Sequence, residues 1–102
     1  MEAVEPGHLY HLFNMEGRFP PQTLEFIKKE DGLMIHDGTT NEEVVEVLID
    51  RMTFLDQKLP CRDNGMIISA LNMALGHMRD RRKKRLAQKV LGTDKPHIEG
   101  GQ

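Results

Sequence analysis

Two apolar stripes joined by a very short connector constrain the fold of this chain more than any other feature. The first stripe follows Thr40-Asn41-Glu42-Glu43, a capping box in which the Thr hydroxyl and the Glu43 carboxylate each take a free backbone N–H of a helix start. Apolar residues then recur at three- and four-residue spacings, which predicts a helix over 41–57 that ends before Pro60. The residues of this stripe are Val44, Val45, Leu48, Ile49, Met52 and Leu55.

A second amphipathic stripe begins at 61–63 and continues to Gly92, a typical helix stop. Because the connector is so short, the two helices must form an antiparallel hairpin. Their lengths of about 17 and about 28 residues leave the second helix overhanging by ~15 Å at 1.5 Å per residue. The overhang cannot bury Met78, Leu86 and Val90 against its own partner helix, so we expect another protomer to cover them.

The segments on either side of the helical hairpin carry weaker patterns. Asp31-Gly32 lies between two short apolar runs and predicts a small β-hairpin over 23–38. Residues 1–22 show no sustained period and are expected to be partly ordered or irregular, and residues 93–102 to form a flexible tail. The predicted fold class is therefore α+β, mainly α, in which the helical hairpin domain spans 39–92 and the chain is oligomeric.

Charge is distributed unevenly along the 102 residues, although the formal net charge is only −2. Residues 1–60 carry 12 acidic and 5 basic side chains (net −7), whereas residues 61–102 carry 4 acidic and 9 basic ones (net +5). The single cysteine excludes an intramolecular disulfide, and no run approaches the roughly 18 apolar residues of a membrane span. We therefore expect a soluble, cytoplasmic protein with no membrane association.

The sequence gives little indication of catalysis. His8 and His11 have a spacing that could bind a metal, but no carboxylate pair lies nearby at ligand spacing, and incidental surface histidines are the better interpretation. Cys61 next to Arg62 lacks a base partner, and no phosphate-binding glycine loop is present. The sequence predicts no enzyme activity, no metal and no cofactor.

The clearest functional feature is Arg79-Asp80-Arg81-Arg82-Lys83-Lys84-Arg85, which has six cations among seven residues. Cations near a helix C-terminus complement the helix dipole, but six exceed that need. Clustered cations also suit nonspecific nucleic-acid binding, although the rest of the chain is acidic and has few aromatics. A small phosphate-bearing ligand needs only two or three arginines, and Arg81 and Arg85 share one helical face.

A base-recognition pair is predicted at the opposite end of the hairpin. Phe54 offers a ring for stacking, and Asn64 offers an amide that can read a base edge. Asn64 lies 17 residues from Arg81, which is roughly 25 Å along a helix, so one small ligand cannot touch both within one chain. If two hairpins pack antiparallel about a two-fold axis, the arginines of one chain reach the Phe54 end of the other.

These motifs resemble a known family. The stretches "DGTTNEEVVEVLIDR", "LPCRDN" and "RRKKRLAQKVLGT" look like the hairpin domain of phage-encoded cyclic-nucleotide sponges, closest to the Thoeris anti-defence branch and more distantly to the anti-CBASS branch. The resemblance covers residues 23–93. It implies a homohexamer built as a trimer of dimers, with ligands bound between protomers. The family's ligand-binding positions fall on Phe54, Asn64, Arg81 and Arg85, with Arg62 and Lys29 as looser matches.

The resulting hypothesis is a protein that binds and sequesters cyclic nucleotide immune messengers in an infected bacterial cell without cleaving them. Its ligands would be cyclic ADP-ribose isomers or cyclic di- or oligonucleotides, and its effect would be to block Thoeris- or CBASS-like signalling. Two alternatives from other classes stay open: a small nucleic-acid-binding regulatory protein that uses the basic helix end, and an enzyme that degrades the messenger.

Overall fold

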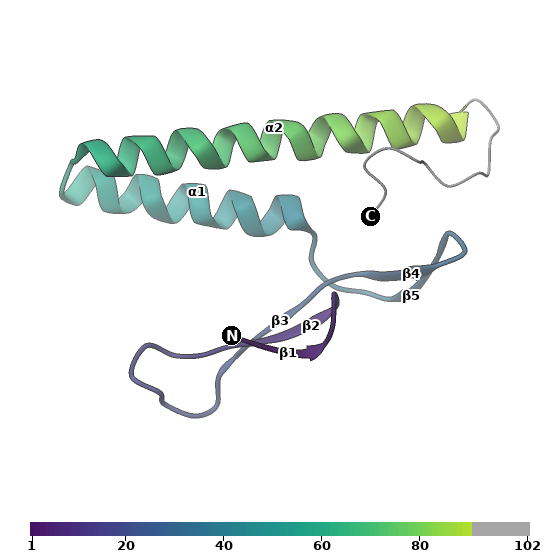
Figure 1. Ribbon diagram of the computed structural model, residues 1–102, viewed down its shortest axis with the longest axis horizontal. Helices are drawn as coiled ribbons and strands as arrows, with labels where there is room; N and C mark the ends of the chain where they lie inside the picture. Colours follow the sequence, from purple (N-terminus) through teal and green to yellow (C-terminus); the bar gives the residue numbers. More distant parts are fainter. Residues whose placement is uncertain (91–102) are drawn as a thin grey trace. The chain divides into compact units, whose positions relative to one another are not determined.

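The computed structural model describes residues 1–90 and divides into two compact units, Met1–Glu43 and the helical unit from Val44 onwards. Five strands precede two long helices in the described residues (Figure 1), so the chain has an α+β fold that is mainly helical, as the sequence predicted. The predicted helix stop at Gly92 and the predicted tail over 93–102 lie outside the described residues.

The first unit contains a three-stranded antiparallel sheet that the sequence analysis missed. Its strands are β1 (Glu2–Glu5), β2 (Leu9–Leu12) and β3 (Gln22–Glu25), in the spatial order β1-β2-β3. The expectation that residues 1–22 are partly ordered or irregular is therefore wrong for this stretch. Strands of four residues are too short to show an alternating pattern, and the ladder bonds that stabilise them join residues distant in sequence.

The predicted β-hairpin is present but shorter than expected. β4 (Lys28–Glu30) and β5 (Leu33–His36) pair antiparallel on either side of Asp31 and Gly32. These two turn residues have φ values of 51° and 77°, as a tight hairpin turn of the mirror-image type requires. The predicted boundary at residue 23 is corrected, because residues 22–25 form β3 and pair with β2 instead.

Backbone hydrogen bonds around Phe26 join the three-stranded sheet to the hairpin within this unit. The Phe26 N–H donates to the His8 carbonyl at 2.7 Å, and the Thr39 N–H donates to the Glu25 carbonyl at 2.8 Å. The Phe26 ring meets Tyr10 edge to face, with 5.9 Å between ring centroids. Gly38 allows this close approach, since a Cβ there would lie 2.6 Å from the Glu25 carbonyl oxygen.

The second unit is the predicted helical hairpin. Helix α1 (Asn41–Lys58) begins as the capping box requires, with the Thr40 hydroxyl accepting the Glu43 N–H at 3.2 Å. Helix α2 (Arg62–Val90) returns beside α1 in the opposite direction (Figure 1), and an Arg79–Glu46 ion pair of 2.9 Å joins the two helices. Because α2 has 29 residues and α1 has 18, α2 is longer by ~16 Å.

Very little of this chain is buried in the described residues. Leu75 of α2, 5% exposed, is their one fully buried hydrophobic residue. Leu86 is 53% exposed, as expected for the overhang, whereas Met78 is half-buried because α1 still runs alongside it, as the neighbouring Arg79–Glu46 pair shows. The side chain of Val90 is outside the description.

Neither of the two helices in the described part of the chain has the length and apolar character that crossing a membrane requires.

Candidate functional site

The turn between the helices is closed by side-chain hydrogen bonds centred on Asp56. Asn64 donates from Nδ2 to Asp56 Oδ1 at 3.3 Å and to the Leu59 carbonyl at 3.3 Å. The backbone N–H of Cys61 also donates to Asp56 Oδ1 at 3.3 Å. Asn64 thus has a structural role that the sequence analysis did not foresee. Both of its bonds use the side-chain nitrogen, so the amide oxygen is the atom that can accept a hydrogen bond from a ligand.

Phe54, in the last turns of α1, presents its ring to solvent and is 52% exposed. Lys58 lies over this ring, with its Nζ 4.8 Å from the ring centroid, within cation–π range. The sequence analysis missed Lys58, although its i, i+4 spacing from Phe54 places both residues on one helical face. Arg62, exposed at the start of α2, adds a second cation to this end of the hairpin.

The basic run divides along α2 as its spacing predicted. Arg81 and Arg85 are half-buried, while Arg82, Lys83 and Lys84 between them are exposed. Arg79 is also exposed and forms an ion pair with Glu46. Asn64 and Arg81 lie on one continuous helix, roughly 25 Å apart along its axis. The structure therefore places the two predicted half-sites at opposite ends of the same hairpin.

Lys29 belongs to β4 of the N-terminal unit, whereas the other predicted ligand-binding residues belong to the helical unit. Its side chain is exposed there, whereas the preceding Lys28 is half-buried.

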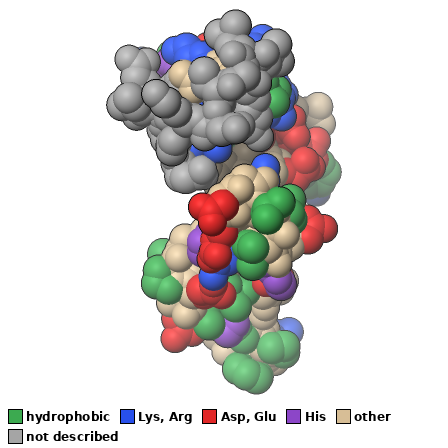
Figure 2. All heavy atoms as spheres, turned by 90° about the vertical axis from the view of Figure 1, so that its right-hand side faces the viewer, with side chains coloured by type: hydrophobic (Ala, Val, Ile, Leu, Met, Phe, Trp, Pro, Cys, Tyr) green, Lys and Arg blue, Asp and Glu red, His purple; other side chains and the backbone are tan. Residues whose placement is uncertain are grey.

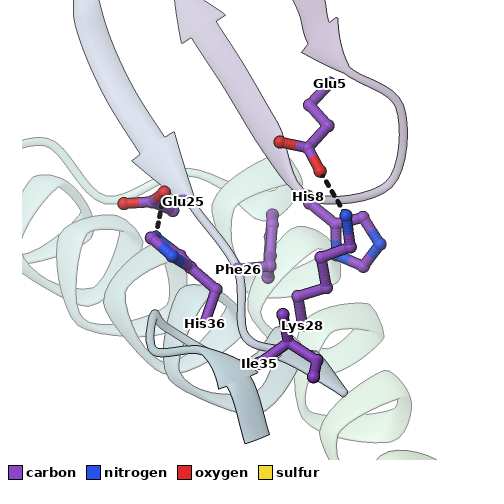
Figure 3. A pocket seen from close by; sticks show the side chains of 7 residues that line it. All are labelled: Glu5, His8, Glu25, Phe26, Lys28, Ile35 and His36. Carbon is purple, nitrogen blue, oxygen red and sulfur yellow. Dashed lines mark hydrogen bonds and ion pairs between the residues drawn. The ribbon is translucent and has the colours of Figure 1, made fainter. Parts of the chain in front are cut away.

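A small pocket of about 180 Å³ lies within the N-terminal unit between the sheet and the hairpin (Figure 3). Two ion pairs flank it: Lys28 Nζ lies 2.8 Å from Glu5, and His36 Nε2 lies 2.6 Å from Glu25. His8 Nδ1 is 3.3 Å from the Ile27 carbonyl, while Phe26 and Ile35 supply apolar walls. No sequence pattern predicted this pocket, because its lining residues come from β1, β3, β4, β5 and the segments between them and meet only in the folded unit.

The Glu5–Lys28 pair affects both partners' protonation. The hydrogen bond from Lys28, with its positive charge, lowers the pKa of Glu5, and the same contacts raise the pKa of Lys28. Because the carboxyl pKa is lowered in the folded protein, the ionised Glu5 stabilises the fold at pH values above the ordinary pKa of glutamate. This stabilisation is lost as the pH falls through the lowered pKa. Because the lysine pKa is raised in the folded protein, the protonated Lys28 stabilises the fold at pH values below the ordinary pKa of lysine. This stabilisation is lost as the pH rises through the raised pKa. The pair therefore stabilises the fold between a pH of about 4 and about 10.

Residues 1–90 contain the two histidines and the cysteine that the sequence analysis considered for metal binding or nucleophilic chemistry. No three histidine, cysteine or acidic side chains in this part of the chain are arranged to hold a metal ion. His8 and His11 have separate partners, the Ile27 carbonyl and Glu2. Cys61 is a free, exposed thiol.

Comparisons of the chain with protein-family models, with curated proteins and with solved structures find no match. The chemistry of the two half-sites is therefore the basis for a functional proposal.

The ion pair yields a direct prediction. Replacing Lys28 by Met should raise the pKa of the Glu5 carboxyl back towards that of an ordinary glutamate, because the hydrogen bond and the charge are both removed. Carbon-13 NMR titration of the Glu5 carboxyl measures this value, and Lys29→Met on the same strand is the matched control. An identical Glu5 titration in the wild type and in Lys28→Met would contradict the pairing.

Proposed function

We propose that the protein sequesters cyclic nucleotide messengers, without cleaving them, at sites formed between two copies of the chain. The observation that carries the proposal is the placement of Asn64 and Arg81 on one helix, roughly 25 Å apart. Base-recognition groups at one end of the hairpin and phosphate-binding groups at the other end can meet on one small ligand only if they come from different chains. The resemblance of the helix starts and the turn to the phage sponge family supports the same arrangement.

The proposed site assigns each residue a role that its chemistry suits. Phe54 stacks on a base, and the Asn64 amide oxygen accepts a hydrogen bond from a base edge. Arg81 and Arg85 of the neighbouring chain bind the phosphates with charge-assisted hydrogen bonds worth roughly 1.5–3 kcal/mol each. Together with a stacked base worth roughly 1–3 kcal/mol, these contacts sum to roughly 4–9 kcal/mol, whose upper end reaches the about 8 kcal/mol of micromolar affinity.

Two cations near the turn between α1 and α2 favour a phosphate-bearing ligand over a neutral one. Lys58 over the Phe54 ring and Arg62 at the start of α2 add positive charge beside the stacking position. We assign Arg62 to a second phosphate contact. Lys29 belongs to the proposal as a basic residue that approaches the ligand from the N-terminal unit.

The proposed biological role follows from binding the messenger without cleaving it. A protein that holds cyclic ADP-ribose isomers or cyclic di- or oligonucleotides lowers their free concentration in the cytoplasm of an infected bacterium. Thoeris- or CBASS-like effectors that need the messenger would then stay inactive. The family resemblance implies a homohexamer, a trimer of dimers, and within each proposed dimer the two half-sites pair twice.

A second candidate function rests on the exposure of Lys83 and Lys84 on α2. Exposed cations on a helix are suited to nonspecific nucleic-acid binding driven by counterion release. Gel-shift titration with duplex and single-stranded DNA over a salt series separates the two functions, because only this candidate predicts long-polymer binding with a steep salt dependence.

Arg81→Ala and Arg85→Ala should each lower affinity for the bound cyclic nucleotide by about tenfold or more, because each removes a charge-assisted hydrogen bond to phosphate. Isothermal titration calorimetry against cyclic ADP-ribose isomers and cyclic dinucleotides measures the change. Lys83→Ala, which removes an exposed cation from the same helix, is the matched control. Equal affinity of Arg81→Ala and wild type for every ligand that binds would contradict the assigned site.

Sequestration without cleavage predicts that a bound messenger is recovered unchanged. After incubation with excess protein, heat denaturation should release the ligand with its original retention time and mass in liquid chromatography and mass spectrometry. New products that appear with wild-type protein but not with Phe54→Ala would show instead that the protein is an enzyme acting at this site.

A further inference from the structure

The loop that joins β2 to β3, residues 13–21, presents large apolar side chains on a well-defined framework. Its organising residue is Asn14, whose Nδ2 donates to the Arg18 carbonyl at 2.7 Å and to the Pro20 carbonyl at 2.9 Å. Asn14 Oδ1 accepts a hydrogen bond from Gln22 at 3.1 Å, and the Asn14 carbonyl accepts the Gly17 N–H at 2.9 Å. The loop backbone is thus folded around one half-buried amide side chain.

This framework directs three large apolar side chains outwards. Phe13 is 64% exposed, Phe19 is 90% exposed and Met15 is fully exposed. A polar surface loop of this length would normally carry such residues singly or pack them beneath itself. Three exposed apolar side chains on one hydrogen-bonded loop are of the kind that marks an interaction surface. Figure 2 shows hydrophobic side chains at the surface of this unit beside acidic side chains and histidines.

Charge indicates what this loop binds. Residues 1–43 carry 9 acidic and 3 basic side chains (net −6), whereas residues 44–90 carry 5 acidic and 10 basic ones (net +5). The loop itself is neutral, because Arg18 lies 3.3 Å from Glu16. An anionic lipid surface would repel the unit that carries the loop. A second copy of this chain offers the opposite charge on residues 79–90 of α2, which carry 1 acidic and 7 basic side chains (net +6), whereas residues 44–78 have a net charge of −1.

The helical unit also offers the apolar surface that such a loop needs. Met66 and Met73 of α2 are 57% and 66% exposed, and their seven-residue spacing places them on one face of the helix. In the described part of this unit only Leu75 is fully buried, so a large apolar area stays available for a partner.

We propose that the β2–β3 loop is an assembly element, in which Phe13, Met15 and Phe19 of one copy dock against the α2 face carrying Met66 and Met73 of a second copy. The acidic N-terminal unit then lies against the basic residues 79–90 of its neighbour's α2. This interface is separate from the nucleotide site, and the inference depends on the proposed function only in that both require a second copy.

Photo-crosslinking with isotope mixing tests the proposal directly. A photoreactive amino acid in place of Met15 is introduced into full-length protein, and equal amounts of nitrogen-14 and nitrogen-15 chains are mixed before irradiation. Mass spectrometry should find cross-links between light and heavy chains, with attachment points around Met66 and Met73. The same photoreactive group in place of Glu30, an exposed residue of β4, is the control and should give far fewer such cross-links.

Sedimentation measures the energetic contribution of the loop. Phe13→Ser, Met15→Ser and Phe19→Ser combined should raise the dissociation constant of self-association by about tenfold or more, because three apolar contacts are lost. Glu16→Gln with Arg18→Gln, which keeps the apolar side chains, should change it little. Backbone NMR spectra of each variant show whether the sheet around β2 and β3 stays folded.

Three results would overturn the proposal: cross-links confined to one chain, cross-links only to vesicle lipids added to the mixture, or self-association unchanged in a folded triple variant. Failure of the proposed function has a different signature. In that case loop variants weaken self-association as expected, yet wild-type protein binds no cyclic nucleotide at any protein concentration.

Discussion

The Asp56–Asn64 contact at the helical turn determines how the rest of this chain can work. Asp56 accepts hydrogen bonds from the Asn64 side chain and from the Cys61 backbone, which fixes where α2 begins relative to the end of α1. From that point the regular rise of the helix determines every later position. Phe54, Lys58 and Arg62 therefore lie around the turn, and Arg81 and Arg85 lie at a fixed distance from it. The separation of the two half-sites follows from the helical rise between Asn64 and Arg81 within α2.

The helical part of the fold was predictable because its signals are local. The capping box at Thr40 and the three- and four-residue spacing of apolar residues act within a turn or two of helix, so one sequence suffices to find them. The Asp31-Gly32 turn was predictable for the same reason. The sheet formed by β1, β2 and β3 was not, because its four-residue strands are stabilised by partners up to 16 residues away, such as Leu9 opposite Glu25.

The candidate site was predictable in its residue types and only partly in its contacts. Helical spacing separated Arg81 and Arg85 from the exposed cations between them, as the structure shows. The same reasoning missed that Asn64 closes the turn and that Lys58 covers the Phe54 ring. Both contacts depend on side-chain conformations that spacing alone does not specify. The pocket of the N-terminal unit depends on two ion pairs between separate strands, which no local pattern encodes.

The proposed intersubunit site requires that its two half-sites come from different chains. Complementation between two inactive variants tests this requirement. Phe54→Ala/Arg62→Ala removes one half-site and leaves the Asp56–Asn64 contact in place, and Arg81→Ala/Arg85→Ala removes the other half-site. Each variant alone should bind no cyclic nucleotide at concentrations that saturate wild type. After random mixing, half of the dimers are mixed and each has one intact site of two, so about a quarter of the wild-type sites should return in calorimetric titration. No recovery of binding, in a sample whose native mass spectrum shows mixed dimers, would contradict a site shared between chains.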